Sequence, residues 1–340
     1  MLLFLAIPAV LLILGIIYQR IGVSSDLERH PPPGRLIEVD GVSLHIRATG
    51  TGRPAVIFES GVAASSVSWT PVQDLIAEFT STASYDRSGF GWSHQTERPQ
   101  TAMEMVESLR SLLKTAGFVS PFIFVGHSFG ALLVRLYADR WPEEVAGMVL
   151  VDPALLLEWA DPSPERLRML GRGIALSRRG ALLAKIGFVR LSLSLLTGGS
   201  RALPKLFSKL SSGKGHSVSE RLVGEVRKLP PALWPVVQSH WCRPQSFESM
   251  ARHLAALPET AALVYKTNPS RSIPVTVISA GALTQSQLAE HETIARSSDQ
   301  GRHIVAGRSG HWVHLDEPEI VVEAIRDILS RSGVSRMQEN

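Results

Sequence analysis

The chain has 340 residues, of which 44% are hydrophobic and 19% charged, and its formal net charge at pH 7 is +4. This length and composition predict a globular protein that can bury a large core. The single cysteine, Cys242, excludes an internal disulfide framework. No Cys/His cluster has zinc-like spacing, although His311 and His314 lie three positions apart. We therefore expect neither a metal site nor a cofactor.

The N-terminal segment is uncharged from Leu2 to Tyr18, a run of 17 residues that is near the lower limit for a bilayer span. A cleaved secretory signal is the alternative. However, no basic residue precedes the run, and the sequence YQRIGVSS contains no clear cleavage site. We interpret residues 1–22 as a retained membrane anchor. Arg20, Arg29 and Arg35 follow the run, which favours a cytoplasmic body.

The first half of the chain alternates short apolar strands with amphipathic helices after a linker over residues 23–35. The sequence RLIEVDGVSLHIRATG predicts a β-hairpin that turns at Asp40-Gly41. The sequences PAVIFESG, STASY, PFIFVGH and EVAGMVLVD then predict buried strands. Helices are expected over 69–79, over 101–116 and directly after PFIFVGH.

The second half interrupts this alternation with leucine-rich helical segments over residues 161–262, and the alternation then resumes with IPVTVISAG and GRHIVAG as strands. This order predicts an α/β protein with a mostly parallel sheet covered by helices on both faces. The core is expected over 36–160 and 263–332, followed by a tail over 333–340. The helical insertion is expected to cap the carboxyl edge of the sheet, where such folds bind ligands.

A G-x-S-x-G pattern, Gly126-His127-Ser128-Phe129-Gly130, lies between a predicted strand and a predicted helix. This strand–turn–helix setting is typical of a nucleophile elbow. With the further stretches IFESGV, YDRSGFGWS, VAGMVLVDP and SGHWVHLDEPEIV, the chain resembles the α/β-hydrolase family from about Leu36 to Ser330. The resemblance implies the α/β-hydrolase fold with a helical cap, and it implies a serine hydrolase in which Ser128 is the nucleophile.

A nucleophilic serine needs a base within hydrogen-bond reach, and the chain has eleven histidines. By resemblance the base is His311, which follows the last predicted strand in a glycine-flanked loop. The chain order of serine before histidine agrees with this assignment. His127 is too close to the serine along the chain, and His45 lies in the hairpin. His303 and His314 are interpreted as loop or surface groups.

The base needs a carboxylate that orients its imidazole ring. Many members of the family place this acid after the penultimate strand, but here that loop reads SAGALTQSQ and has no acid before Glu290. Asp152 ends the preceding strand of the sheet and is the position used in some branches of the family. We therefore favour Asp152, although this residue could also cap a turn. Glu290, Glu292 and Asp299 remain as alternatives.

Acyl transfer also requires two hydrogen-bond donors for the developing oxyanion. The backbone N–H of Phe129, directly after the nucleophile, is expected to be one of them. By resemblance the second is the Val62 N–H, and Gly61 before it lets the chain pass close to the reacting carbon. Asp86 and Arg87 suggest a functional ion pair, but we interpret them as residues that tie their loop down.

The expected cap is strongly basic, with 11 Lys and Arg residues and no Asp or Glu between Arg166 and Lys214. One stretch interleaves basic residues with leucines: Arg178, Arg179, Lys185 and Arg190. A lid helix with one solvated face explains this pattern. Contact with anionic lipid headgroups is the alternative, because an anchor would hold the cap near a membrane. The patch has no interleaved aromatic residues, so nucleic acid is not an expected partner.

The sequence therefore predicts a membrane-anchored serine hydrolase that cleaves an ester-like bond. Thioester, amide and carbon–carbon bonds remain possible targets, and a non-catalytic binding protein is the alternative from another class. Dehalogenase and epoxide-hydrolase activities are disfavoured because those branches carry a carboxylate at the elbow. The leucines of the cap, together with Phe188, Phe207 and Trp234, suggest a small-molecule substrate with an apolar acyl or alcohol group.

Overall fold

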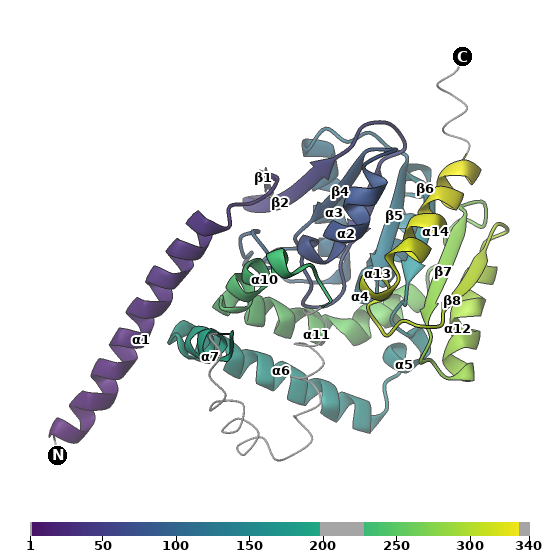
Figure 1. The fold of residues 1–340 in the computed structure, drawn as a ribbon. Coiled ribbons are helices and arrows are strands. Elements are labelled where there is room, and N and C mark those ends of the chain that lie inside the picture. The colour runs from purple at the N-terminus through teal and green to yellow at the C-terminus, as the bar shows by residue number, and fades with distance from the viewer. Residues whose placement is uncertain (1, 198–227, 333–340) are drawn as a thin grey trace. The chain divides into compact units, whose positions relative to one another are not determined.

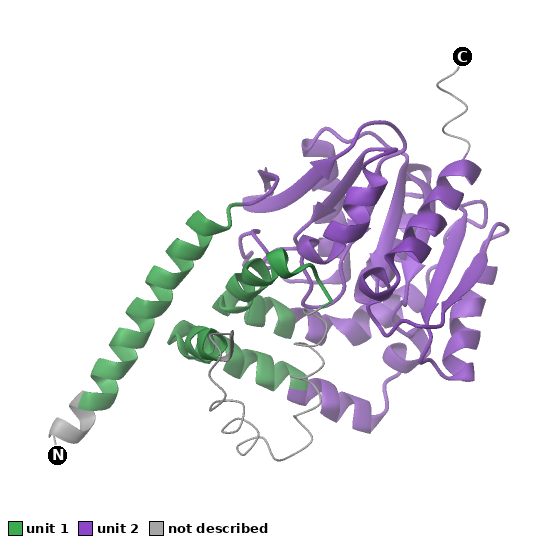
Figure 2. Cartoon of the chain, in the orientation of Figure 1, with its two compact units in different colours: residues 1–31, 173–251 green, residues 32–172, 252–340 purple. Residues whose placement is uncertain are grey.

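The computed structural model describes residues 2–197 and 228–332 (Figure 1). Phe207, the basic residues within 198–227 and the expected tail lie outside the described residues. The chain divides into two compact units (Figure 2). Unit 1 contains residues 1–31 and 173–251, and unit 2 contains residues 32–172 and 252–340. Two helices, α6 (Pro164–Lys185) and α11 (Pro244–Tyr265), run across the boundaries between the units.

Unit 2 is built on one eight-stranded sheet with the strand order β1-β2-β4-β3-β5-β6-β7-β8. Strand β2 pairs antiparallel with β1 and β4, and all other pairs are parallel. The strands are β1 (Arg35–Val39), β2 (Val42–Thr49), β3 (Val56–Glu59), β4 (Thr82–Tyr85), β5 (Phe122–His127), β6 (Val145–Val151), β7 (Val275–Ala280) and β8 (Arg302–Ala306). The mostly parallel sheet predicted from the sequence is confirmed, including the hairpin that turns at Asp40-Gly41.

The central strands β3, β4, β5 and β7 are buried on both faces of the sheet. Successive side chains of a strand point to opposite faces. In β5, Phe122 and Phe124 belong to one apolar cluster, whereas Ile123 and Val125 belong to the other. The first cluster is covered by α3 (Ala102–Thr115), α4 (Phe129–Arg140) and α12 (Gln285–Arg296). The second is covered by α2 (Thr70–Ile76) and α14 (Pro318–Arg331). Four short helices complete the unit: η1 (Ser66–Trp69), η2 (Pro142–Glu144), α5 (Leu156–Ala160) and α13 (Val313–Asp316).

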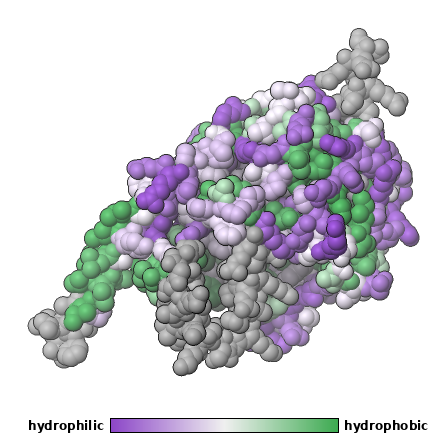
Figure 3. All heavy atoms as spheres, in the orientation of Figure 1, coloured by the Kyte–Doolittle hydropathy of each residue, from purple (hydrophilic) through white to green (hydrophobic). Residues whose placement is uncertain are grey.

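Unit 1 is helical. Its described elements are α1 (Leu2–Arg29), the end of α6, α7 (Phe188–Thr197), η3 (Pro231–Leu233), α10 (Trp234–Trp241) and the start of α11. Helix α1 contacts both α7 and α10. Every residue from 7 to 14 of α1 is exposed, and the helix forms a hydrophobic rod in Figure 3. Within the described ranges, α1 alone is long and apolar enough to cross a membrane.

Candidate active site

The turn between β5 and α4 holds Ser128 in an unusual backbone conformation, with φ 53° and ψ −116°. The two flanking glycines are sterically required. A Cβ at Gly126 would lie 2.8 Å from the backbone nitrogen of Ala131, and a Cβ at Gly130 would lie 2.5 Å from the carbonyl oxygen of Ser60. Such strained turns persist only where the surrounding structure holds them. The G-x-S-x-G pattern therefore forms the tight strand-to-helix turn that presents the serine hydroxyl.

His311 contacts a carboxylate at the end of the neighbouring strand β6. Its Nδ1 lies 2.6 Å from Oδ2 of Asp152. The other oxygen of this carboxylate, Oδ1, accepts a hydrogen bond of 2.9 Å from the N–H of Ala280 at the end of β7. Asp152 is buried, whereas the side chain of His311 is 50% exposed. The carboxylate is thus held between two strand ends, and it contacts an imidazole ring that is half exposed.

The other three acids considered from the sequence have different partners. Glu290 accepts hydrogen bonds from the amides that open α5. Oε2 of Glu292 lies 2.9 Å from Nδ1 of His303. Asp299 pairs with an exposed arginine at 2.6 Å. Of the four candidates, only Asp152 is brought to His311.

The two backbone donors expected for an oxyanion belong to segments next to the serine. Phe129 is the first residue of α4, so its N–H has no acceptor within the helix. Gly61 packs against the elbow, since a Cβ there would lie 3.5 Å from the Cβ of Ser128. The hydrogen bonds of the described residues give neither the Phe129 nor the Val62 amide an acceptor. Within the described residues, neither N–H group is committed to a backbone acceptor.

His127 is a buried neighbour of the site, and its Nε2 lies 2.8 Å from the carbonyl oxygen of His311. Burial lowers the pKa of His127 well below its usual value, and the nearby rings of His311 and His314 lower it further. A neutral imidazole can donate its Nε2 proton to that carbonyl. His127 thus fixes the backbone of the loop that carries His311.

Two histidines differ from their expected positions. The sequence interpretation of His314 and His303 as loop or surface groups is wrong. His314 lies in α13, is fully buried and stacks on Trp69 with 4.2 Å between ring centroids. His303 lies in β8, where its Nε2 is 2.7 Å from the hydroxyl of Ser279. His314 is thus a core residue, and His303 is a partly buried strand residue.

No hydrogen bond joins the Ser128 hydroxyl to the His311 ring among the contacts of the described residues. The two residues are connected through His127, whose ring centroid is 4.6 Å from that of His311. The N–H of Ser128 also donates to the carbonyl of Val151 at 3.0 Å, one residue before Asp152. In enzymes without ligand such catalytic hydrogen bonds are often long, and they tighten only when substrate is bound.

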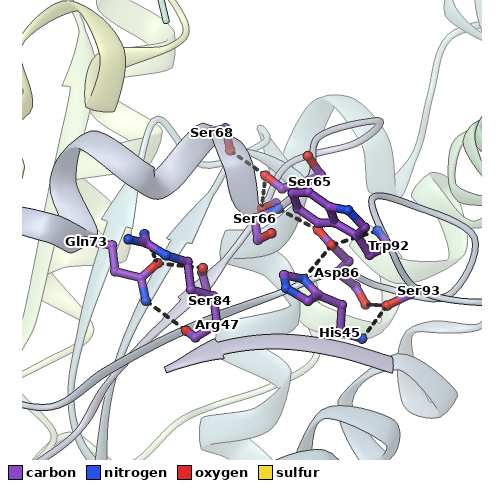
Figure 4. A network of polar contacts seen from close by, with 11 residues as sticks. His45, Arg47, Ser65, Ser66, Ser68, Gln73, Ser84, Asp86, Trp92 and Ser93 are labelled. Carbon is purple, nitrogen blue, oxygen red and sulfur yellow. Dashed lines mark hydrogen bonds and ion pairs between the residues drawn. The ribbon is translucent and has the colours of Figure 1, made fainter. Parts of the chain in front are cut away.

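Asp86 organises a buried polar network next to this region (Figure 4). Its Oδ2 lies 2.8 Å from Nδ1 of His45 and accepts from the N–H of Trp92 at 3.1 Å. Its Oδ1 accepts from the N–H of Ser66 at 2.7 Å. Asp86 thereby connects β2, η1 and its own glycine-rich loop, which is a structural role.

Arg87 pairs with Glu59 rather than with its neighbour Asp86. Glu59 ends β3, and its second carboxylate oxygen accepts a hydrogen bond from the hydroxyl of Tyr85 at the end of β4. Burial raises the pKa of Glu59, although the guanidinium of Arg87 opposes this shift. Neither Glu59 nor Tyr85 was predicted from the sequence as a site residue. The available signal was the presence of polar residues at the ends of two apolar strands.

The parallel sheet and the serine turn define a class of hydrolytic enzymes. A family model described as the alpha/beta hydrolase fold matches residues 54–318, so the chain belongs to this family of hydrolases, as its sequence resemblance predicted. The described residues contain no group of three or more His, Cys, Asp or Glu side chains that could hold a metal ion.

Similar proteins cover most of the chain. The uncharacterized protein YqjL of Bacillus subtilis (strain 168) is 26% identical over 297 residues, which are 85% of this chain and 89% of YqjL. A thermophilic esterase from Thermogutta terrifontis is 20% identical, with a TM-score of 0.56, and covers 87% of this chain and 97% of its own. The epoxide hydrolase CorEH is 17% identical, with a TM-score of 0.64, and the match covers 87% of this chain and 98% of CorEH. At these identities the solved structures are similar in fold alone.

Proposed function

We propose that this protein is a serine hydrolase that cleaves ester-like bonds, with Ser128 as nucleophile, His311 as base and Asp152 as the acid that orients it. The contact of 2.6 Å between His311 and Asp152, beside a serine elbow, is the observation that carries this proposal. The loop SAGALTQSQ has no acid, and the position of Asp152 beside His311 supports an enzyme rather than a non-catalytic binding protein.

Acyl transfer then follows from the positions of these groups. The Ser128 oxygen attacks the carbonyl carbon of the substrate, and Nε2 of His311 accepts the hydroxyl proton. The amides of Phe129 and Val62 donate to the resulting oxyanion. His311 returns the proton to the leaving alcohol, and a water molecule activated by the same ring releases the acid. Asp152 stabilises the imidazolium in both steps.

The epoxide hydrolase CorEH has a similar fold, so epoxide opening is the reaction to compare with ester cleavage. The identity of the nucleophile favours ester cleavage. The epoxide-hydrolase branches of the family use a carboxylate at the elbow, whereas this chain has the Ser128 hydroxyl. An alkoxide adds to a carbonyl group to form an acyl-enzyme that water can hydrolyse. The serine therefore supports ester-like substrates.

Hydrolysis of p-nitrophenyl esters of graded chain length tests the proposed activity. We expect turnover, with kcat/KM rising from acetate to octanoate by about 10-fold or more, since each buried CH₂ contributes about 0.8 kcal/mol of binding. The apolar residues of the expected cap, including Trp234, motivate this preference. Failure to hydrolyse any ester, thioester or aryl amide of the series would contradict the activity itself.

We further propose that α1 anchors the protein in a membrane with its body on the cytoplasmic side. The exposed residues 7–14 are apolar on all faces of the helix, and a helix of this kind requires an apolar environment. Arg20, Arg29 and Arg35, which follow the apolar run, support the cytoplasmic orientation.

A further inference from the structure

One face of α1 packs against the other helices of unit 1. Gly15, Gln19, Gly22 and Asp26 are spaced four, three and four residues apart, so they share one side of the helix. Gln19 and Asp26 are buried, in contrast to residues 7–14, which are all exposed. The helix thus changes at Gly15 from an uncovered apolar rod to a packed element.

The packing begins at the turn between α6 and α7, which we call the elbow turn (Ile186-Gly187). A Cβ at Gly15 would lie 2.3 Å from the carbonyl oxygen of Ile186, and a Cβ at Gly187 would lie 2.6 Å from the carbonyl oxygen of Gly15. Gly187 also has a φ of 75°, which favours glycine. The two backbones therefore touch at one defined level along α1.

A buried polar cluster fixes this level. Arg190 pairs with Asp26 at 2.7 Å, and its Nε donates to Oε1 of Gln19 at 3.0 Å. The amide of Gln19 in turn donates to the carbonyl of Cys242 at 2.7 Å. Sliding of α1 would break these contacts and leave buried charges unpaired. Arg190, considered from the sequence as a lipid-facing residue, is instead buried because it belongs to this cluster.

The level of the contact lies inside the apolar run of α1. Gly15 precedes Tyr18, the last residue of the run, by three residues, or about 4.5 Å along the helix axis. If α1 is embedded in a bilayer as far as Tyr18, the elbow turn, which contacts Gly15, lies at the edge of the hydrocarbon core. Four apolar side chains around this turn are exposed: Leu182 by 63%, Leu183 by 41%, Phe188 by 44% and Leu191 by 49%. The exposed charge among them, Lys185, pairs with Glu248 at 2.8 Å.

We propose that the helices flanking the elbow turn, residues 182–191, insert into the interface of a phospholipid bilayer beside α1. The apolar side chains lie in the outer acyl region, within about 5–10 Å of the headgroups. Arg178 and Arg179, both exposed on α6, approach anionic headgroups. The protein is then held by two membrane contacts. This inference rests on the proposed anchor, and it is independent of the proposed chemistry.

Depth-dependent quenching tests the insertion with the full chain in phospholipid nanodiscs. Single cysteines at Ile13, Leu182, Leu191 and Leu27 are labelled with bimane in a Cys242→Ala background. The lipids carry a nitroxide near the headgroup in one set of nanodiscs and in the acyl chain in a second set. Leu27 is the matched control, because it is 45% exposed on α1 but lies nine residues, or about 13 Å, beyond the apolar run. We expect quenching at 182 and 191 to exceed that at 27 by about twofold or more.

The outcomes distinguish membrane anchoring by α1 from insertion of residues 182–191. Quenching by acyl-chain nitroxides at 13, together with headgroup-nitroxide quenching at 182 and 191, supports both. Quenching at 13 with water-like emission at 182 and 191 overturns the insertion alone. No quenching at 13 overturns the anchor and the insertion with it. Blue-shifted emission without lipid quenching at 182 and 191 means that protein covers this face, which also overturns the proposal. Esterase activity of the same samples reports on the chemistry separately.

A second inference concerns Arg87 and the loop that follows β3. The guanidinium of Arg87 donates to two successive carbonyl groups of this loop, those of Ser60 (Nη1, 2.6 Å) and Gly61 (Nη2). It also lies over the ring of Phe129, 5.6 Å from the centroid. Arg87 is buried, and Glu59 neutralises its charge. Arg87 thus contacts the residue that carries one of the expected oxyanion amides, Phe129, and the residue directly before the other, Gly61.

The geometry of the peptide bond connects Arg87 to the oxyanion. The Gly61–Val62 bond is not among the cis bonds of the chain, so its C=O and N–H point in opposite directions. When Arg87 holds the Gly61 carbonyl on one side, the Val62 N–H is fixed on the other. We infer that Arg87 is a positioning residue that orients the Val62 amide toward the oxyanion, a role that rests on the proposed function.

Arg87→Lys tests this role, because lysine keeps the charge beside Glu59 but cannot hold two carbonyl groups in a fork. We expect kcat to fall by about 10²-fold, as for loss of one oxyanion donor, with KM nearly unchanged. Affinity for a trifluoromethyl ketone, whose serine adduct carries an oxyanion, should fall by a similar factor. Affinity for the corresponding alcohol, which forms no adduct, should not change.

Arg47→Lys is the matched control, since Arg47 bonds two side chains of α2, Gln73 and Asp74, and does not contact the loop after β3. Wild-type kinetics in Arg87→Lys would overturn the inference. Equal losses for ketone and alcohol, accompanied by a lower Tm, would reduce Arg87 to a structural role and also overturn it. Lack of esterase activity in the unmodified protein would instead contradict the proposed function.

Discussion

Replacing Ser128 with alanine is expected to lower kcat for ester hydrolysis by about 10⁵-fold and to abolish labelling by a fluorophosphonate probe. The probe forms a covalent bond to an activated serine oxygen, and the variant has no such oxygen. Alanine retains the Cβ of serine, so the strained turn is unchanged. Among the described residues the Ser128 hydroxyl makes no hydrogen bond, and the Tm should therefore remain close to that of the unmodified protein.

Ser297→Ala is a suitable control, because this serine lies at the end of α12 and its hydroxyl bonds only the carbonyl of Ile294. It should label and hydrolyse substrate like the unmodified protein. Persistent labelling of Ser128→Ala would show that another residue reacts with the probe. Retained hydrolysis by the purified variant would contradict the assignment of the nucleophile.

Asp152→Asn should reduce kcat by about 10⁴-fold while leaving the fold intact. The asparagine oxygen can still accept the hydrogen bond from the Ala280 N–H, so the structural contact survives. Its NH₂ group then faces Nδ1 of His311, which favours the tautomer that carries its proton on Nε2. That tautomer cannot accept the proton of Ser128. Steady-state kinetics together with thermal unfolding measure both parts of this prediction.

Glu292→Gln is the matched control for the acid. Glu292 is the other candidate carboxylate whose partner is a histidine, His303, and it does not contact His311. The variant should retain activity within about twofold, since surface pairs contribute about 0–1 kcal/mol. A large loss in Glu292→Gln combined with normal activity in Asp152→Asn would instead assign the acid to Glu292 in α12.

The sequence was sufficient for features that depend on neighbouring residues. Glycines at 126 and 130 predict a tight turn because a Cβ at either position collides with the backbone. The alternation of apolar strands and amphipathic helices predicts a parallel sheet, because only such a sheet buries both faces of a strand. The apolar run of α1 identifies a possible membrane helix by length and composition.

The tertiary structure decided which distant residues meet. Four acids were compatible with the sequence, and only the placement of β6 beside β5 and β7 brings Asp152 to His311, 159 positions away. The pairing of Arg190 with Asp26 and the bonds of Arg87 to the loop after β3 could not be read from composition either. Local sterics and periodicity act over a few residues, whereas ion pairs and hydrogen bonds between strand ends depend on strand order, which long-range packing determines.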